Sequence, residues 1–386
     1  MLAERYAHAT RAGLAEQVHT LAKSMRTMED LERIRTLYHR SRDIENALAR
    51  WKDADLESLR LAVEDLVATY GSGYRDGAKY LQRIRRVQDT IAGTRRALGE
   101  AGDLERFFES VQQFEALRTE ALLSNPLMDF DRMLVVKRRD ARAYSPMPRF
   151  AIPPFSTGPG HLLNGLPLNY QGNGVLRQIP IDNEIAVLSP ICPDGRLTTV
   201  FRPEQPAYVG DIKLHFDADR LLFSSIGSHD RFQIFEVGVS GENLRQVTRG
   251  EEHDIDNYDA CYLADDRILF GSSSCFQSVP CQRRHDEVAN LCVMNPDGSG
   301  VRRLCFDQDH NWYPSLLPNG RVLYLRWEYA DTPHYFSRVL MHMNPDGTDQ
   351  VEFYGSNSYW PNGLWYARPI PGSSSKFVAI VSGHHG

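Results

Sequence analysis

The second half of the chain repeats itself with a period of about 50 residues, and this repeat constrains the fold more than any single motif. The turn NPDGSG at 295–300 recurs as NPDGTD at 344–349, and CPDGRL at 192–197 fits the same place. Between these turns, short polar stretches such as ADDR and LPNGR each lead into a β-rich run. Four short strands in a repeat of this length are typical of a β-propeller blade.

The repeats can be laid out strand by strand. Three complete blades are predicted, at about 207–250, 251–306 and 307–353. An outer pair of strands is predicted at 184–202, and only two inner strands remain in 354–386. Two interpretations follow: the terminal pieces combine to close a four-bladed ring, or the chain is a fragment of a larger propeller. The apolar strand directly before the final SGHHG favours the fragment.

The chain as a whole is predicted to combine α-helices with an all-β part. Residues 1–123 carry apolar side chains at helical spacing, and Thr27 with Asp30 fits a variant of the capping box. Residues 124–174 are a bridge too rich in proline and glycine for regular structure, apart from one short β-like run. Residues 175–386 form the partial or small propeller of four-stranded blades.

Composition excludes several classes of protein. The net charge of −6 gives no reason to expect nucleic-acid binding, and no run of 18 apolar residues is present that could span a membrane. The first residues carry charges where a signal peptide needs an apolar core, so no export signal is visible. No C-x-x-C-H motif exists for covalent haem attachment.

The six cysteines all lie after residue 190 and leave two interpretations open. Cys275 with Cys281 could close a small loop, and Cys292 with Cys305 could face each other across a hairpin. Alternatively, all of these cysteines are buried free thiols, as is common for unpaired cysteine.

One face of the predicted propeller gathers the residues that carry chemistry. The loops between second and third strands, and the links between blades, hold most of the later histidines together with carboxylates and aromatic rings. The candidate ligand-binding residues are His253, Asp254, Asp256, Asp309, His310, Trp312, His334, Tyr359, Trp360, His384 and His385.

This set has a functional and a structural interpretation. His253, His310 and His384 could bind a divalent metal, or histidine and aspartate could act as acid and base. Repeats also duplicate structural residues, so each histidine could simply hydrogen-bond a neighbouring loop. Trp312 and Trp360, at equivalent places in their repeats, fit packing between blades as well as a sugar-stacking surface.

Longer stretches carry a family resemblance. The PDG turns that precede strands ending Leu-Arg-x-Leu/Val-Thr resemble those of TolB-like (PD40) propellers over about residues 184–386. The stretches HDIDNYDACYLADDRILFGSSSCFQSVPC, FDQDHNWYPSLLPNGRVLYLRWEY and SNSYWPNGLWYARPIPG resemble proteins related to the hydrazine synthase alpha subunit, with SNPLMDFDRMLVVKR upstream. That second resemblance covers about residues 124–386.

The resemblance implies a large, mostly exported bacterial protein in which more propeller follows Gly386. Further domains of a larger parent chain, or a partner protein, are therefore expected beside this one, in the periplasm or outside the cell. Hydrazine chemistry is not carried over, because the haem attachment motif is missing. The leading hypothesis is a ligand- or partner-binding propeller module without independent activity. The alternative is a metal-dependent lyase or hydrolase acting on carbohydrate.

Overall fold

A computed structural model of the chain divides into two compact units. The described residues are 16, 19–23, 27–39, 56–97, 104–138, 182–278, 287–327, 338–355 and 363–382. The helical unit comprises Met1–Arg132 with Pro190–Gly195, and the propeller unit comprises Met133–Ser189 with Arg196–Gly386. The domain boundaries expected after residues 123 and 174 stay predictions.

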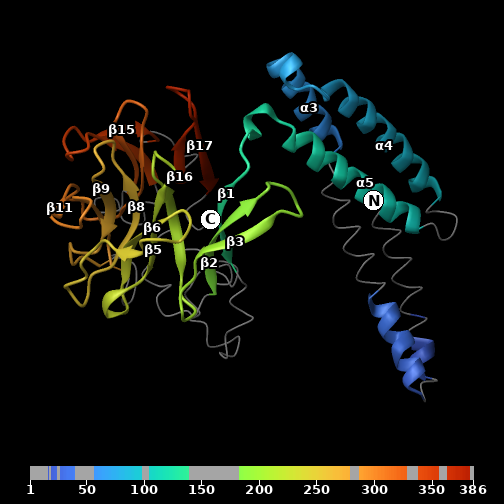
Figure 1. The fold of residues 1–386 in the computed structure, drawn as a ribbon, viewed down its shortest axis with the longest axis horizontal. Helices are drawn as coiled ribbons and strands as arrows, with labels where there is room; N and C mark the ends of the chain where they lie inside the picture. Colours follow the sequence, from blue (N-terminus) through green and yellow to red (C-terminus); the bar gives the residue numbers. More distant parts are fainter. Residues whose placement is uncertain are drawn as a thin grey trace. The chain divides into compact units, whose positions relative to one another are not determined.

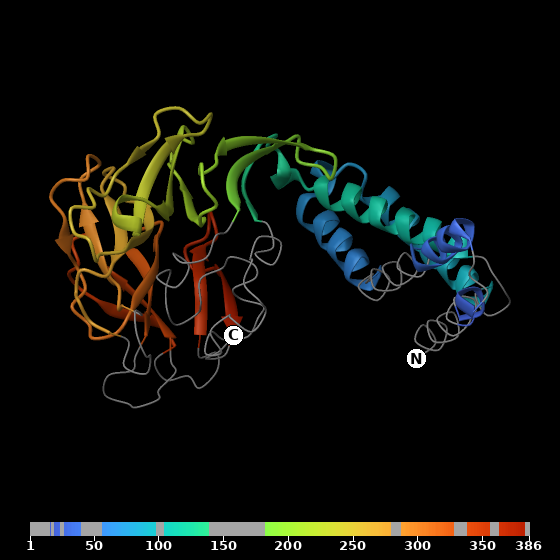
Figure 2. The ribbon, with the colours of Figure 1, turned by 90° about the horizontal axis from the view of Figure 1, so that it is seen from below.

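Three helices make up the core of the helical unit: α3 (Leu56–Tyr70), α4 (Gly77–Ala97) and α5 (Leu104–Leu123). They lie side by side, as Figures 1 and 2 show. Their apolar faces enclose a buried cluster that includes Leu59, Val63, Ile84, Phe114 and Leu117. The predicted capping box is confirmed: the Thr27 and Asp30 backbone N–H groups each donate to the other residue's side chain.

The propeller unit contains the three predicted blades. The first consists of β4 (Val209–Leu214), β5 (Arg220–Ile226), β6 (Phe232–Gly238) and β7 (Arg245–Gln246). The second consists of β8 (Asn257–Tyr262), β9 (Ile268–Ser272), β10 (Asn290–Met294) and β11 (Arg302–Arg303). The third consists of β12 (Asn311–Leu316), β13 (Val322–Trp327), β14 (Arg338–Met343) and β15 (Val351–Tyr354). Each blade is an antiparallel sheet (Figure 1), so the predicted partial propeller of four-stranded blades is confirmed.

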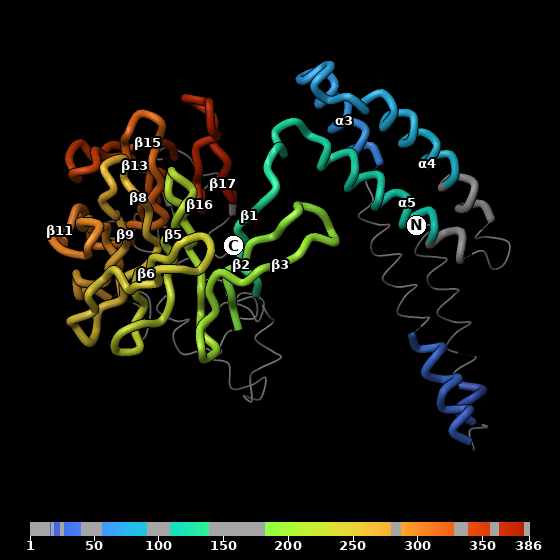
Figure 3. Tube along the Cα trace, in the orientation of Figure 1, coloured from blue at the N-terminus to red at the C-terminus, as the bar shows by residue number. Residues whose placement is uncertain are grey.

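Two incomplete sheets flank these blades in sequence. The strands β1 (Met133–Arg138), β2 (Asn183–Ser189) and β3 (Arg196–Phe201) form a three-stranded antiparallel sheet. The strands β16 (Gly363–Pro369) and β17 (Phe377–Ser382) form a hairpin, coloured red in Figure 3, that joins β14 through one parallel pair. Within the described residues, β17 pairs only with β16 and β1 only with β2, so these strands do not close a ring.

The blades are held together by apolar side chains on both faces of their inner strands. Every residue of β9 and β10 is buried, which explains their near-continuous apolar sequences. Cys261, Cys292 and Cys305 are buried in this core as free thiols, and Cys192 and Cys275 are partly buried free thiols. Of the two interpretations that the sequence left open, these cysteines fit free thiols rather than disulfides. Cys292 faces Arg303 across the hairpin instead of Cys305, and Cys281 lies outside the described residues.

Candidate functional site

The first strand of each blade contains a β-bulge at the same place. The bulges span 210–213 in β4, 258–261 in β8, 312–315 in β12 and 365–368 in β16. In each, the second residue has a left-handed backbone: Asp211 (φ 54°), Asp259 (φ 52°), Tyr313 (φ 51°) and Tyr366 (φ 53°). Glycine is the usual residue for such a conformation, and a non-glycine residue there costs on the order of 1–3 kcal/mol. Four equivalent strained positions therefore carry carboxyl or phenol side chains where glycine would be easier.

These four residues, which we call the axial cluster, come together because the first strands of successive blades contact one another. The Tyr313 backbone N–H donates to Asp259 Oδ2 at 2.7 Å. The rings of Tyr313 and Tyr366 lie 4.2 Å apart between centroids. Asp211 is close enough to act electrostatically on both Asp259 and Tyr366. The bulges thus bring two carboxyl groups and two phenols from four strands to one place.

Asp259 is the most perturbed group of the axial cluster. Its side chain is almost completely buried, with the residue 3% exposed. Burial raises the pKa of Asp259 well above its ordinary value, and the nearby Asp211 charge raises it further. The Tyr313 N–H opposes this effect without cancelling it. Asp259 consequently holds a proton more readily than an ordinary aspartate does.

Two arginines border the other carboxyl group, Asp211. Burial lowers the pKa of Arg368 to about 10, and the Asp211 charge partly offsets this effect. The guanidinium of Arg138 lies over the ring of Tyr208, 5.3 Å from the centroid. The Tyr208 hydroxyl is in turn 3.5 Å from Asp211 Oδ1. Asp211 therefore has cationic neighbours, whereas the groups that set the pKa of Asp259 are carboxyl and backbone groups only.

The raised pKa of Asp259 predicts that Asp259→Asn stabilises the protein at neutral pH. The folded state binds more protons than the unfolded state between the unfolded pKa, about 3.9, and the higher folded pKa. Stability from this group is therefore lost as pH rises through that window. The asparagine keeps an oxygen for the Tyr313 N–H and has no charge to bury. We expect the variant and the wild type to unfold at similar urea concentrations near pH 4. As pH rises, the variant should need increasingly more urea to unfold than the wild type does. Equal or lower stability of the variant at pH 8 would contradict this electrostatic account.

The residues singled out by the sequence are distributed between surface and core. His253 and Asp254 are exposed in the link that precedes β8. The His253 ring lies 3.8 Å from the ring of His229 between centroids, and its carbonyl oxygen accepts a hydrogen bond from Arg231 Nε. Neither His253 nor Asp254 is part of the axial cluster.

Asp256 is buried and joins the first two blades. Its Oδ1 accepts the Phe232 backbone N–H at 2.8 Å, and its Oδ2 pairs with the Arg231 guanidinium at 3.2 Å. The side chain of Arg231 is itself largely buried. These contacts give Asp256 a structural role in the interface between blades.

His310 and Trp312 are also buried, in an aromatic stack. His310 Nδ1 accepts the Ala289 backbone N–H at 3.0 Å, and the imidazole stacks on Trp312 with 4.2 Å between centroids. Trp327 continues the stack. Asp309, the preceding residue, is buried too. The surroundings of Trp312 are therefore those of a residue that packs in the core.

The remaining predicted residues cannot be placed. His334, Tyr359, Trp360, His384 and His385 lie outside the described residues. Among the residues that are described, no group of three or more His, Cys, Asp or Glu side chains could hold a metal ion. A site built from His253, His310 and His384 stays a prediction.

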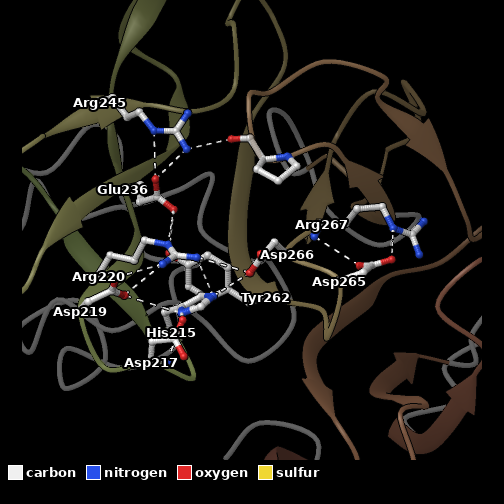
Figure 4. Close-up of polar contacts among 11 residues, drawn as sticks. His215, Asp217, Asp219, Arg220, Glu236, Arg245, Tyr262, Asp265, Asp266 and Arg267 are labelled. Carbon is white, nitrogen blue, oxygen red and sulfur yellow. Dashed lines mark hydrogen bonds and ion pairs between the residues drawn. The ribbon is translucent and has the colours of Figure 1, made fainter.

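The opposite, turn-forming face carries a second polar network, shown in Figure 4. The Asp217 backbone N–H donates to His215 Nδ1, and His215 Nε2 lies 2.8 Å from Asp266 Oδ1 and 2.7 Å from Arg220 Nη2. Glu236 accepts hydrogen bonds from Tyr262 at 2.8 Å and from Arg245 at 2.6 Å. Since Asp266 and Tyr262 belong to the second blade, this network links it to the first.

Arg220 occupies the centre of that network, and its replacement gives a stability prediction. Its guanidinium pairs with Asp219 at 3.0 Å and Asp266 at 3.3 Å and lies over the Tyr262 ring. We expect Arg220→Gln to lower the free energy of unfolding by about 1 kcal/mol, the upper range for partly exposed pairs. Arg249→Gln is the matched control, because its exposed pair with Glu251 is loose at 3.8 Å. Urea denaturation should separate the two variants; equal effects would argue against a special role for Arg220.

The sequence interpretation missed the axial cluster. The available signal was the pair Gly-Asp, Tyr-Asp, Trp-Tyr and Trp-Tyr at positions 210–211, 258–259, 312–313 and 365–366. Each pair lies near the start of the first strand of its blade or hairpin. An alignment of the repeats on these pairs places the four residues of the axial cluster at one position.

Comparison with known proteins finds similarities among solved structures only. No family model and no curated protein matches the chain. Among solved structures, it is similar to hydrazine synthase from Kuenenia stuttgartiensis (13% identity, TM-score 0.42, 62% of this chain and 34% of that chain). It is also similar to TolB from Acinetobacter baumannii (14%, 0.33, 49% and 44%) and to an oligogalacturonate lyase in complex with manganese (12%, 0.37, 64% and 54%).

The resemblance to hydrazine synthase and to TolB-like propellers expected from the sequence is thereby confirmed. The chain spans only about a third to a half of the length of these three structures. In the described part of the chain, no helix is long and apolar enough to cross a membrane.

Proposed function

We propose that this chain is a ligand-binding β-propeller module whose ligand contacts the axial cluster. The observation that carries this proposal is the left-handed, non-glycine residue at the same place in four inner strands. Strain of this kind persists where the surrounding structure enforces it, and it is concentrated at functional sites. Because the strained positions carry carboxyl and phenol groups, the function concerned is recognition of a polar ligand.

The charges of the axial cluster favour a ligand with a positively charged organic group. Asp259 is repelled by Asp211, and the groups that set its pKa include no cation. An ammonium group placed between the two carboxyl groups would relieve this repulsion. Tyrosine rings attract cations through their faces, and Arg138 already lies over Tyr208 in this way. The proposed ligand is therefore an organic ammonium.

The module is further proposed to act beside other domains of a larger parent chain, or a partner protein, outside the cytoplasm. The second strand of the last hairpin supports a neighbour, because Val378, Ile380 and Val381 of β17 are all exposed. An edge strand with exposed β-branched residues is suited to pairing with a further strand. Export is implied by the resemblance and stays a prediction.

A hydrolase or lyase acting on carbohydrate is the second candidate. The carboxyl pair favours it, since Asp259 is buried with a raised pKa while Asp211 is only half-buried. Two carboxyl groups in unlike environments can divide the roles of acid and base. Turnover of a carbohydrate that is lost in both Asp211→Asn and Asp259→Asn would favour this candidate over binding alone.

Thermal unfolding in the presence of small cations tests the leading proposal. A ligand that binds only the folded state raises the unfolding midpoint with its concentration. We expect n-butylammonium and choline chlorides to raise it for the wild type and for the exposed control Asp265→Asn. The shift should disappear in Asp211→Asn. A shift with calcium chloride alone would indicate that the ligand is a metal ion instead of an organic cation. No shift with any of these salts would contradict binding at the cluster.

A further inference from the structure

A cavity of about 300 Å³ is lined by the second blade and the link before it, and its lining includes no residue of the axial cluster. One side is the link between the first two blades, which runs from Thr248 to Ile255, and the other is the turn at 298–301. Between them the cavity reaches Asn257 of β8 and Ser272 of β9. Its volume is at the small end of the range for ligand pockets, about 300–1,000 Å³, so it suits a ligand of one or two rings.

The inner wall of this cavity is a polar network with spare hydrogen-bonding capacity. Gln233 is fully buried behind it, and its Oε1 accepts from Thr248 Oγ1 at 2.6 Å and from Asn257 Nδ2 at 3.1 Å. In this orientation Gln233 Oε1 serves both donors. Gln233 Nε2 is a buried donor without an acceptor among the described residues. Thr248 and Asn257 both line the cavity, so the unused donor lies directly behind its wall.

Gly250 keeps this wall open. It has a left-handed backbone, with φ of 61°, and lines the cavity. A Cβ atom at this position would come within 2.8 Å of the Ser228 Cβ and 3.2 Å of Gln233 Nε2. A residue with a side chain would therefore cover the buried donor, which glycine leaves next to the cavity.

The rest of the lining combines apolar surface with a negative rim. Ile255, Phe270 and Val301 supply the apolar surface. At the rim, Arg249 is paired with Glu251 at 3.8 Å, which leaves the charge of Glu252 in excess. Hydroxyl and amide groups beside apolar surface match a sugar ring, which presents hydroxyl groups around apolar C–H faces. The excess negative charge disfavours an anionic ligand.

We propose that this cavity is a binding site for a neutral polyhydroxylated ligand, a single sugar unit or a similar polyol. The proposal goes beyond the axial ligand and concerns a separate site. Hydroxyl groups of the ligand would pair with the amide and serine groups of the inner wall, and a C–H face would lie on the Phe270 side. A site of this size with an exposed mouth should bind weakly.

Saturation-transfer-difference NMR on the full chain tests the proposal, with glucose, galactose and N-acetylglucosamine as probes and glucuronate as the anionic comparison. We expect transfer to at least one neutral sugar and little to glucuronate. Val301→Trp should fill the mouth of the cavity and reduce the signal at least tenfold, since Val301 is exposed there. Val378→Trp, at an exposed valine of β17, is the matched control and should keep the signal.

A second variant controls for an effect of the introduced tryptophan itself. Asn257→Ala removes a wall amide, and it should also abolish the signal while the far-ultraviolet circular dichroism stays that of the wild type. Asp211→Asn should bind sugar normally, which separates this site from the axial one. The proposal is overturned if no neutral sugar gives a signal, if Val301→Trp binds as the wild type does, or if glucuronate is preferred.

Discussion

Replacing Asp256 with alanine is expected to lower the free energy of unfolding by about 3–4 kcal/mol. The substitution leaves the guanidinium of Arg231 without its closest carboxylate in a largely buried position. It also leaves the Phe232 backbone N–H without its acceptor. Breaking one half of a buried ion pair is costly because the remaining charge stays desolvated. Equilibrium unfolding in guanidinium chloride at neutral pH measures the loss.

Asp254 provides the matched control for this experiment. It lies two residues earlier in the same link, and the sequence made it an equal candidate for the ligand-binding face. It is exposed, so Asp254→Ala should change stability by no more than about 0.5 kcal/mol. If Asp256→Ala cost no more than Asp254→Ala, the structural role assigned to Asp256 would be wrong.

Replacing His310 with alanine is the second large effect, an expected loss of about 2–4 kcal/mol. The imidazole is fully buried, stacks on Trp312 and accepts the Ala289 backbone N–H. Its removal creates a cavity in the aromatic core and leaves a buried donor without its partner. Denaturant unfolding measures the loss, and tryptophan fluorescence should report loosening of the stack around Trp312 and Trp327.

His253→Ala is the comparison for His310→Ala, because the sequence made both histidines candidate metal ligands. His253 is exposed, so its replacement should leave stability within about 0.5 kcal/mol of the wild type. A contrary result would be near-native stability in His310→Ala together with loss of a stoichiometric metal ion measured by elemental analysis. That outcome would restore the interpretation of His310 as a metal ligand.

The blades could be predicted from the sequence because their signals are local. A polar turn fixes a hairpin, and an apolar run directly after it fixes the next strand, as the PNG turn at 318–320 does where it leads into β13. The capping box at Thr27 could also be predicted, since its two partners are only three residues apart. The position of β1 was harder to predict, because its pairing with β2 joins strands separated by the intervening bridge.

The axial cluster could not be predicted from alternation along the strands. A bulge inserts one residue and shifts the alternation, so the side chains beyond it change face relative to those before it. Asp259 and Tyr313 therefore come together although their strands belong to different blades. Repetition of histidine and aspartate was also ambiguous, because it marks structural contacts as readily as ligands. Asp256 and His310 show the structural case.

Proton release on binding tests the central claim most directly. If an organic ammonium takes the place of the proton that Asp259 holds, binding must release that proton. Isothermal titration calorimetry of n-butylammonium chloride, in buffers of different ionisation enthalpy, measures the number released. We predict a net release of protons that declines once the pH exceeds the raised pKa of Asp259, and none in Asp259→Asn. Binding without proton release, or no binding to the wild type, would contradict the assignment of the ligand site to the axial cluster.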